Sequence, residues 1–177
     1  ELNSVLLDLL RTHLPREYRK PLDAGAVRVH LADPRKFLEN SGEYDLILSG
    51  MPEPASGQTN RFYTLEYFRQ CANTLKPKGI LALCLRSSEN LWTPFLTYRN
   101  ASIYHTLRSV FQDVLVIPGT TNIILASDAR LIRDPDRLMK RFEERNIKAR
   151  LVSPEYIQYL YLNDRFFQIA HHLSHAK

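Results

Sequence analysis

Apolar residues along the first half of the chain recur at two different periods. In residues 2–14 they fall at helical spacing, and Pro15 follows, which predicts a helix that ends there. Residues 27–31 (VRVHL) alternate and are rich in β-branched side chains, which predicts a strand. Residues 44–48 (YDLIL) are nearly all apolar, as in a parallel strand covered on both faces, and residues 80–85 repeat this pattern.

Helix signals separate the predicted strands. Asp33 precedes a proline and is a candidate N-cap for a short helix. Thr64 is a candidate cap for a helix over residues 64–75, and another helix is predicted over residues 101–110. Because strands and helices alternate, the pattern favours βαβ units and a parallel sheet.

The later part of the chain changes character twice. Residues 114–117 and 122–126 are short strands joined by a proline-glycine turn, which predicts an antiparallel hairpin. A mostly parallel α/β sheet that ends in such a hairpin is the layout of the Rossmann-like class I methyltransferase fold. Beyond residue 127 the chain is charged and helical. We therefore expect a Rossmann-like domain over residues 1–127 and a helical appendage over residues 128–177.

Composition and charge narrow the functional classes. Lysine and arginine number 24 against 19 acidic residues, giving a net charge of +5. The basic residues are scattered and are not interleaved with aromatic residues in a nucleic-acid motif, so we expect a solvated basic face and no nucleic-acid partner. No apolar run in the sequence reaches the roughly 18 residues that a membrane span needs.

The segment from residue 27 to residue 54 (VRVHLADPRKFLENSGEYDLILSGMPEP) is followed by TNRFYTLEYF and LKPKGILALCL. Together these segments resemble the spermidine synthase-like (aminopropyltransferase) family, in particular its bacterial members that are fused to membrane-spanning segments. The resemblance covers roughly residues 1–127. It implies transfer of an aminopropyl group from decarboxylated S-adenosylmethionine to a polyamine, and a location at the inner, cytoplasmic face of a bacterial membrane.

The same resemblance places the cofactor residues. Glu1 stands where the family has the acid that binds the ribose hydroxyls, and Asp33 stands where it binds the adenine amino group. For Asp33 the helix-capping role remains open beside this one. The glycines of the sequence, six in number, form no GxGxG cluster, so the family's first strand and Gly-rich turn are expected to precede Glu1. The chain by itself is therefore expected to be inactive, with S-adenosylmethionine or its decarboxylated form bound only by a longer protein.

The loop after residues 44–48 carries the acceptor chemistry that the resemblance implies. Gly50 occupies the position of the family's catalytic aspartate base, and Glu53 occupies the position of the second, amine-binding acid. Glu53 is thus a weak candidate for catalysis, and a solvated loop acid is the other interpretation. Gln58 and Tyr63 are candidates for the substrate pocket, although Tyr63 is equally suited to packing the loop over the sheet. The histidines near the carboxyl end have no acidic or cysteine partners, so we expect no metal site.

Two further hypotheses belong to other classes. The replacement at Gly50 is consistent with a non-catalytic regulatory or interaction domain of a membrane-associated protein. A methyltransferase acting on an unknown acceptor is the third hypothesis.

The resemblance also raises a question about the sheet. In the family's sheet two further strands lie between the segments that correspond to residues 27–31 and 44–48, and this sequence does not contain them. Either the two segments pair directly, or a gap remains, or a second copy of the chain fills the edge, and we expect a homodimer.

Overall fold

The structure, a computed structural model, describes residues 3–88 and 93–176. It divides into two compact units, Glu1–Gly42 and Glu43–Lys177, which are described here separately. The predicted boundary after residue 127 lies inside the second unit and stays a prediction.

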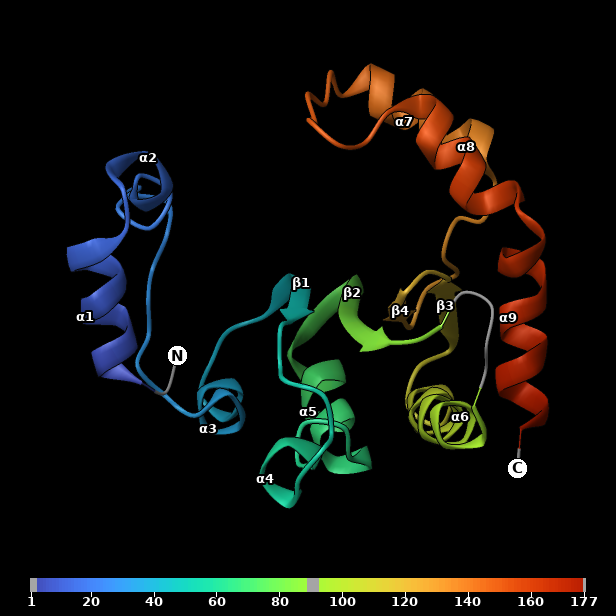
Figure 1. Ribbon diagram of the computed structural model, residues 1–177, viewed down its shortest axis with the longest axis horizontal. Helices are drawn as coiled ribbons and strands as arrows, with labels where there is room; N and C mark the ends of the chain where they lie inside the picture. The colour runs from blue at the N-terminus through green and yellow to red at the C-terminus, as the bar shows by residue number, and fades with distance from the viewer. Residues whose placement is uncertain (1–2, 89–92, 177) are drawn as a thin grey trace. The chain divides into compact units, whose positions relative to one another are not determined.

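The first unit contains three helices in its described residues: α1 (Ser4–His13), α2 (Arg16–Arg19) and α3 (Pro34–Glu39) (Figure 1). α1 begins where the Asn3 side chain accepts hydrogen bonds from the next turn, and it ends before Pro15, as predicted. α3 begins at a proline that follows its capping residue.

The strand predicted over residues 27–31 is wrong: the segment has no regular secondary structure and belongs to no sheet. Its alternating side chains are exposed, with Val27 at 45%, Val29 at 36% and Leu31 at 54% of full exposure. Alternation makes a segment competent for a strand, but a strand forms only against a partner. No strand lies among the described residues of the first unit.

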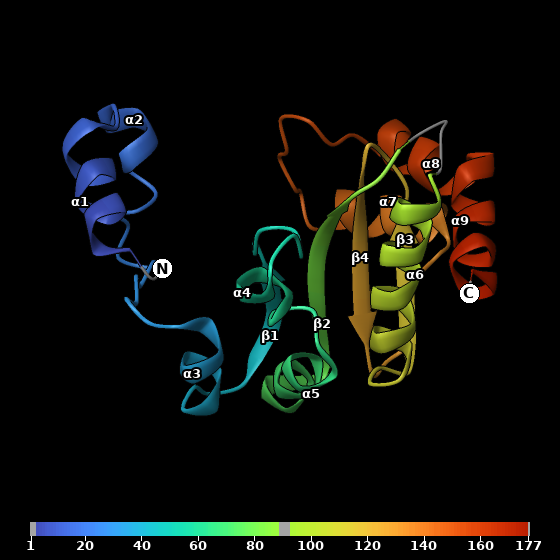
Figure 2. The ribbon, with the colours of Figure 1, turned by 60° about the horizontal axis from the view of Figure 1, so that its bottom comes forward.

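The second unit is built on a four-stranded mixed sheet with the order β1-β2-β4-β3. The strands are β1 (Tyr44–Ser49), β2 (Leu75–Arg86), β3 (Asp113–Ile117) and β4 (Thr121–Ser127) (Figure 2). β1 and β2 are parallel, whereas β4 is antiparallel to both β2 and β3, so the predicted hairpin is confirmed. α5 (Leu65–Thr74) connects the parallel pair, and α6 (Pro94–Arg108) leads to the hairpin.

The main core lies between the sheet and these two helices. α5 contacts β2, α6 contacts β3, and the helices contact each other. Side chains that are completely buried come from every layer of this core: Phe68, Leu81, Leu85, Leu107 and Ile124. Burial of this kind is the main stabilising contribution to the second unit.

β1 departs from the expected burial. Leu46 and Leu48 are 56% and 72% exposed, although the apolar run had predicted a strand covered on both faces. The reason is positional: among the described strands, β1 pairs with β2 alone, and the helices of the second unit leave these two side chains uncovered. A continuous apolar run shows that a strand can be buried on both faces. Whether its side chains are buried depends on the elements that pack against it.

Three helices follow the sheet: α7 (Pro135–Glu144), α8 (Pro154–Leu162) and α9 (Asp164–His175). α9 packs against α6 and β3, as Figures 1 and 2 show. A second apolar cluster, centred on Leu115, Tyr161 and Phe166, joins these helices to the sheet. Asn163 separates two of these helices, because it ends α8 and its side chain caps α9.

Three hydrogen bonds to Asp113 fasten β3 to the segment that follows the sheet. Asp113 accepts two hydrogen bonds from the Arg133 guanidinium, each 2.7 Å long, and a third from the backbone N–H of Leu131. These bonds lower the pKa of the Asp113 carboxyl. Within residues 3–88 and 93–176 no helix is long and apolar enough to cross a bilayer.

Candidate functional site

The candidate site is the loop that leaves the carboxyl end of β1 and leads to α5. It contains the one-turn helix α4 (Gly57–Asn60), which the Ser56 and Thr59 side chains close by a reciprocal capping box. Thr64 then caps α5, as predicted. These caps fix the backbone of the second half of the loop, and Glu53 lies in its first half.

Glu53 is held by two elements that are distant in the sequence. One carboxylate oxygen accepts a 2.6 Å hydrogen bond from the backbone N–H of Arg86, at the carboxyl end of β2. The other accepts a 2.9 Å hydrogen bond from the guanidinium of Arg99 on α6. The Glu53 side chain is 34% exposed and that of Arg99 only 14%. Glu53 is therefore a fixed acid with one side open to solvent, and the interpretation as a freely solvated loop acid does not hold.

Arg99 in turn is held by the residues around it. Its guanidinium donates a 2.7 Å hydrogen bond to the backbone carbonyl of Arg86 and two of 3.3 Å to the side-chain oxygen of Asn100. Asn100 is completely buried, and its amide nitrogen donates to the same Arg86 carbonyl. The arginine is thus fixed in orientation, as a planar guanidinium with several donors allows.

Tyr63 lies beneath the first part of the loop. The residue is 6% exposed, and its hydroxyl lies 3.1 Å from the carbonyl oxygens of both Met51 and Pro52. Burial, and to a smaller extent the negative charge of Glu53, raise the pKa of the phenol. The hydroxyl therefore keeps its proton at neutral pH and donates it to the loop carbonyls. This places Tyr63 as a support of the loop, in agreement with the packing interpretation.

Gly50 begins the loop without any special backbone requirement. A Cβ atom built on it meets no other atom within 4 Å, and its φ is not in the left-handed region. The missing side chain at this position is therefore not imposed by crowding or by backbone conformation. A carboxylate would fit here, and its absence is a property of this sequence.

The predicted site residues divide into three groups. Glu53 and Tyr63 are brought together in one site, and the exposed Gln58 lies on α4 of the same loop. Asp33 caps α3, accepting a 2.9 Å hydrogen bond from the backbone N–H of Arg35, so its capping role is confirmed and its adenine role stays a prediction. Glu1 lies outside the described residues.

The sequence interpretation missed Arg86, Arg99 and Asn100. The helix was predicted to begin only after Asn100, so neither Arg99 nor Asn100 was placed on an element. A signal was present in Thr93, whose hydroxyl caps α6 ahead of a proline. A helix predicted to begin at Thr93 would have included Arg99, which α6 brings from its first turns toward the end of β2 and the loop.

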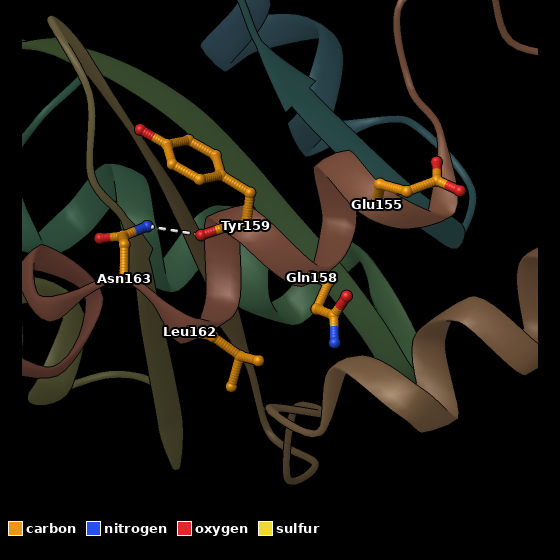
Figure 3. Close-up of a pocket in the computed structure, with 5 residues that line it drawn as sticks. All are labelled: Glu155, Gln158, Tyr159, Leu162 and Asn163. Atoms are coloured by element: carbon orange, nitrogen blue, oxygen red, sulfur yellow. Dashed lines mark hydrogen bonds between the residues drawn. The ribbon is translucent and has the colours of Figure 1, made fainter.

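One further hollow lies on the carboxyl-terminal helices. It is an open depression along α8, lined by Glu155, Gln158, Tyr159, Leu162 and Asn163 (Figure 3). In the ranges 3–88 and 93–176 no three histidine, cysteine, aspartate or glutamate side chains gather as metal ligands would. The loop after β1 is therefore the site with the most developed chemistry.

In open α/β sheets, a loop at the carboxyl end of a parallel strand is where ligands bind, and the acid-bearing loop after β1 stands at that place. The sequence profile of the spermine/spermidine synthase domain matches residues 1–123, and the chain belongs to this family. It is 33% identical over 88 residues to a polyamine aminopropyltransferase of Nitrosomonas europaea, a stretch that is 49% of this chain and 27% of that protein. It is 41% identical over 160 residues to one of Oceanobacillus iheyensis, covering 75% of this chain and 31% of the relative.

The fold agrees with this assignment. A crystal structure of spermidine synthase in complex with the transition state analogue AdoDATO superimposes with a TM-score of 0.73 at 18% identity, over 96% of this chain and 58% of that one. Human methyltransferase-like protein 13 in complex with SAH superimposes with a TM-score of 0.60 at 18% identity, over 90% of this chain and 74% of that one. The chain thus spans about a third or less of the two bacterial relatives.

Proposed function

We propose that this domain serves the transfer of an aminopropyl group from decarboxylated S-adenosylmethionine to an amine. The amine nitrogen attacks the carbon next to the sulfonium. The carbon–sulfur bond breaks, its electron pair stays on sulfur to give a neutral thioether, and the ammonium product loses a proton to the surroundings. The observation that supports this proposal is the acid of the loop after β1, which Arg86 and Arg99 hold in place beside Tyr63.

The acceptor side of the reaction is assigned to this loop. Glu53, fixed and one-third exposed, offers a carboxylate edge to an approaching amine, and the exposed Gln58 on α4 offers an amide. The donor side is assigned to Asp33, for the adenine, and to Glu1, for the ribose. Decarboxylated S-adenosylmethionine is the proposed aminopropyl donor; S-adenosylmethionine itself would be the donor only if the domain transferred a methyl group.

A transfer assay tests the proposal. The gene product that contains this sequence is incubated with labelled decarboxylated S-adenosylmethionine and a mixture of amines, and the thioether product is quantified. We expect its formation to depend on an added amine and to fall at least about tenfold in Glu53→Ala, because an acid that binds or orients one substrate typically contributes that much. Turnover without an added amine, or equal rates for the wild type and Glu53→Ala, would contradict the proposed function.

A non-catalytic regulatory or interaction domain is the second candidate. Gly50 favours it, because the position has room for an acidic side chain and carries none. It predicts that no amine gives product at any donor concentration. Attachment to membrane-spanning segments, and a place at the inner face of a bacterial membrane, stay predictions of the resemblance.

A further inference from the structure

Three of the six histidines of the sequence lie in the last turns of α9, at positions 171, 172 and 175. This helix buries one side, which packs against α6 and β3. All three histidines are exposed, and His171 and His175 lie on the side opposite to the buried one. Their side chains therefore take no part in the core, and the structure leaves them accessible to a ligand.

His171 and His175 are one helical turn apart, which makes them neighbours on the same face of α9. Their rings stack on each other, with 4.1 Å between the ring centroids and an angle of 24° between the ring planes. His172 has a different orientation, because its ring centroid lies 6.3 Å from that of His171 and the two planes are nearly perpendicular, at 80°. The structure thus singles out one pair among the three.

The contacts of His175 determine which of its ring nitrogens carries the proton. Its Nδ1 lies 2.9 Å from the backbone carbonyl oxygen of His171 and 3.0 Å from the hydroxyl of Ser174. A carbonyl oxygen can only accept, and the Ser174 hydroxyl already donates to that same carbonyl at 3.0 Å. Nδ1 of the neutral ring is therefore the donor, and Nε2 of His175 keeps the lone pair that a metal ion would need.

We propose that His171 and His175 together bind one divalent transition-metal ion, with water molecules in the remaining coordination positions. Imidazole nitrogen is a ligand that Zn²⁺, Ni²⁺ and Cu²⁺ accept. Metal–nitrogen bonds of about 2.0–2.1 Å place two coordinated nitrogens about 3 Å apart, and stacked rings reach this separation by small side-chain rotations. A metal-bound histidine commonly donates its other ring N–H to a backbone carbonyl, as His175 does here.

The sequence predicted no metal site, because no acidic or cysteine residue accompanies these histidines. The structure changes that interpretation for the pair, since two histidines one turn apart on a helix can hold zinc from a single face. Two protein ligands make an open site, whereas a closed structural zinc site has four. The site lies on α9 and does not depend on the proposed function of the loop after β1.

A zinc titration of the 177-residue chain tests the proposal, in a buffer that does not itself bind zinc. Calorimetry measures the affinity and the stoichiometry, and the histidine ring signals in NMR spectra report where the ion binds. We expect saturable binding of one ion per chain, with the ring signals of His171 and His175 shifting together. The signals of the three histidines far from α9 should not move: His13, His30 and His105.

Three variants identify the ligands. His171→Gln and His175→Gln should each weaken zinc binding at least about tenfold, because loss of an outer-shell partner alone costs that much. His172→Gln keeps the pair and is the matched control, with an expected affinity equal to that of the wild type. Because all three side chains are exposed, each variant should keep the circular dichroism spectrum of the wild type.

Two other metal ions test the chemistry of the site. Cu²⁺ should bind more tightly than Zn²⁺, and Mg²⁺, which prefers oxygen ligands, should not compete. The proposal would be overturned by the lack of saturable zinc binding, by binding that His172→Gln weakens as much as His175→Gln does, or by shifts centred on the exposed Cys84. These measurements use neither an aminopropyl donor nor an amine, so their outcome is independent of whether the transfer assay succeeds.

Discussion

The role of Glu53 as a fixed acid makes a quantitative prediction about stability. Glu53→Ala removes the carboxylate that accepts from the Arg86 backbone N–H and leaves Arg99, whose side chain is 14% exposed, without its ion-pair partner. A hydrogen bond from a backbone N–H to a charged acceptor contributes about 1.5 kcal/mol. The ion pair adds about 1 kcal/mol once its exposure to solvent is taken into account. We expect a loss of about 2.5 kcal/mol in the free energy of unfolding.

Urea unfolding followed by circular dichroism measures this loss. Glu53→Gln, which keeps an acceptor oxygen but not the charge, should fall between the wild type and Glu53→Ala. Glu143→Ala, which removes an exposed acid on α7, is the matched control and should change stability by less than about 0.5 kcal/mol. A loss below about 0.5 kcal/mol in Glu53→Ala as well would refute the reasoning, because the acid would then be a solvated loop residue.

Two other contacts and one exposed side chain give further predictions. Arg133 lowers the pKa of Asp113, so the stability that this carboxylate contributes is complete above the ordinary carboxyl pKa and is lost as the pH falls through the lower folded-state value. Asp113→Asn should therefore be less stable at neutral pH and should lose less on acidification, in urea titrations between about pH 5 and pH 2. Ser127→Ala, which deprives the Gly79 carbonyl of a buried 2.8 Å hydrogen bond, should cost about 1–2 kcal/mol by the same assay, and an unchanged midpoint would contradict this. Leu48→Lys on the exposed edge strand β1 should weaken any concentration-dependent association of the chain, and light scattering that finds the wild type strictly monomeric would rule out that association.

The sequence correctly predicted those elements whose beginning, end or turn is determined by residues close to it in the sequence. The caps at Asp33 and Thr64 and the hairpin before residue 127 were all predicted from residue types within a few positions of each other. Each of these features is formed by hydrogen bonds between residues that are close in the sequence, so a short stretch of sequence is enough to predict it.

Features that depend on distant partners were not predicted. Residues 27–31 have the pattern of a strand, yet a strand also needs a neighbour, and the first unit offers none among its described residues. The exposure of Leu48 follows from which helices cover β1, which no local pattern records. The clamp on Glu53 joins residues 33 and 46 positions apart, and nothing in the loop itself indicates that Arg86 and Arg99 will meet it.

Asn163 closes α8 and opens α9 with one side chain. Its amide nitrogen donates to the carbonyls of Tyr159, at 2.8 Å, and Leu160, at 3.0 Å, while its amide oxygen accepts from the backbone N–H of Phe166 at 3.0 Å (Figure 3 shows the first of these). The turn between the two helices therefore needs a hydrogen-bond donor on the side of α8 and an acceptor on the side of α9. Aspartate there would serve only the start of α9, and a side chain that only donates would serve only the end of α8. The turn that brings α9 back against α6 and β3 therefore relies on one side chain that both donates and accepts.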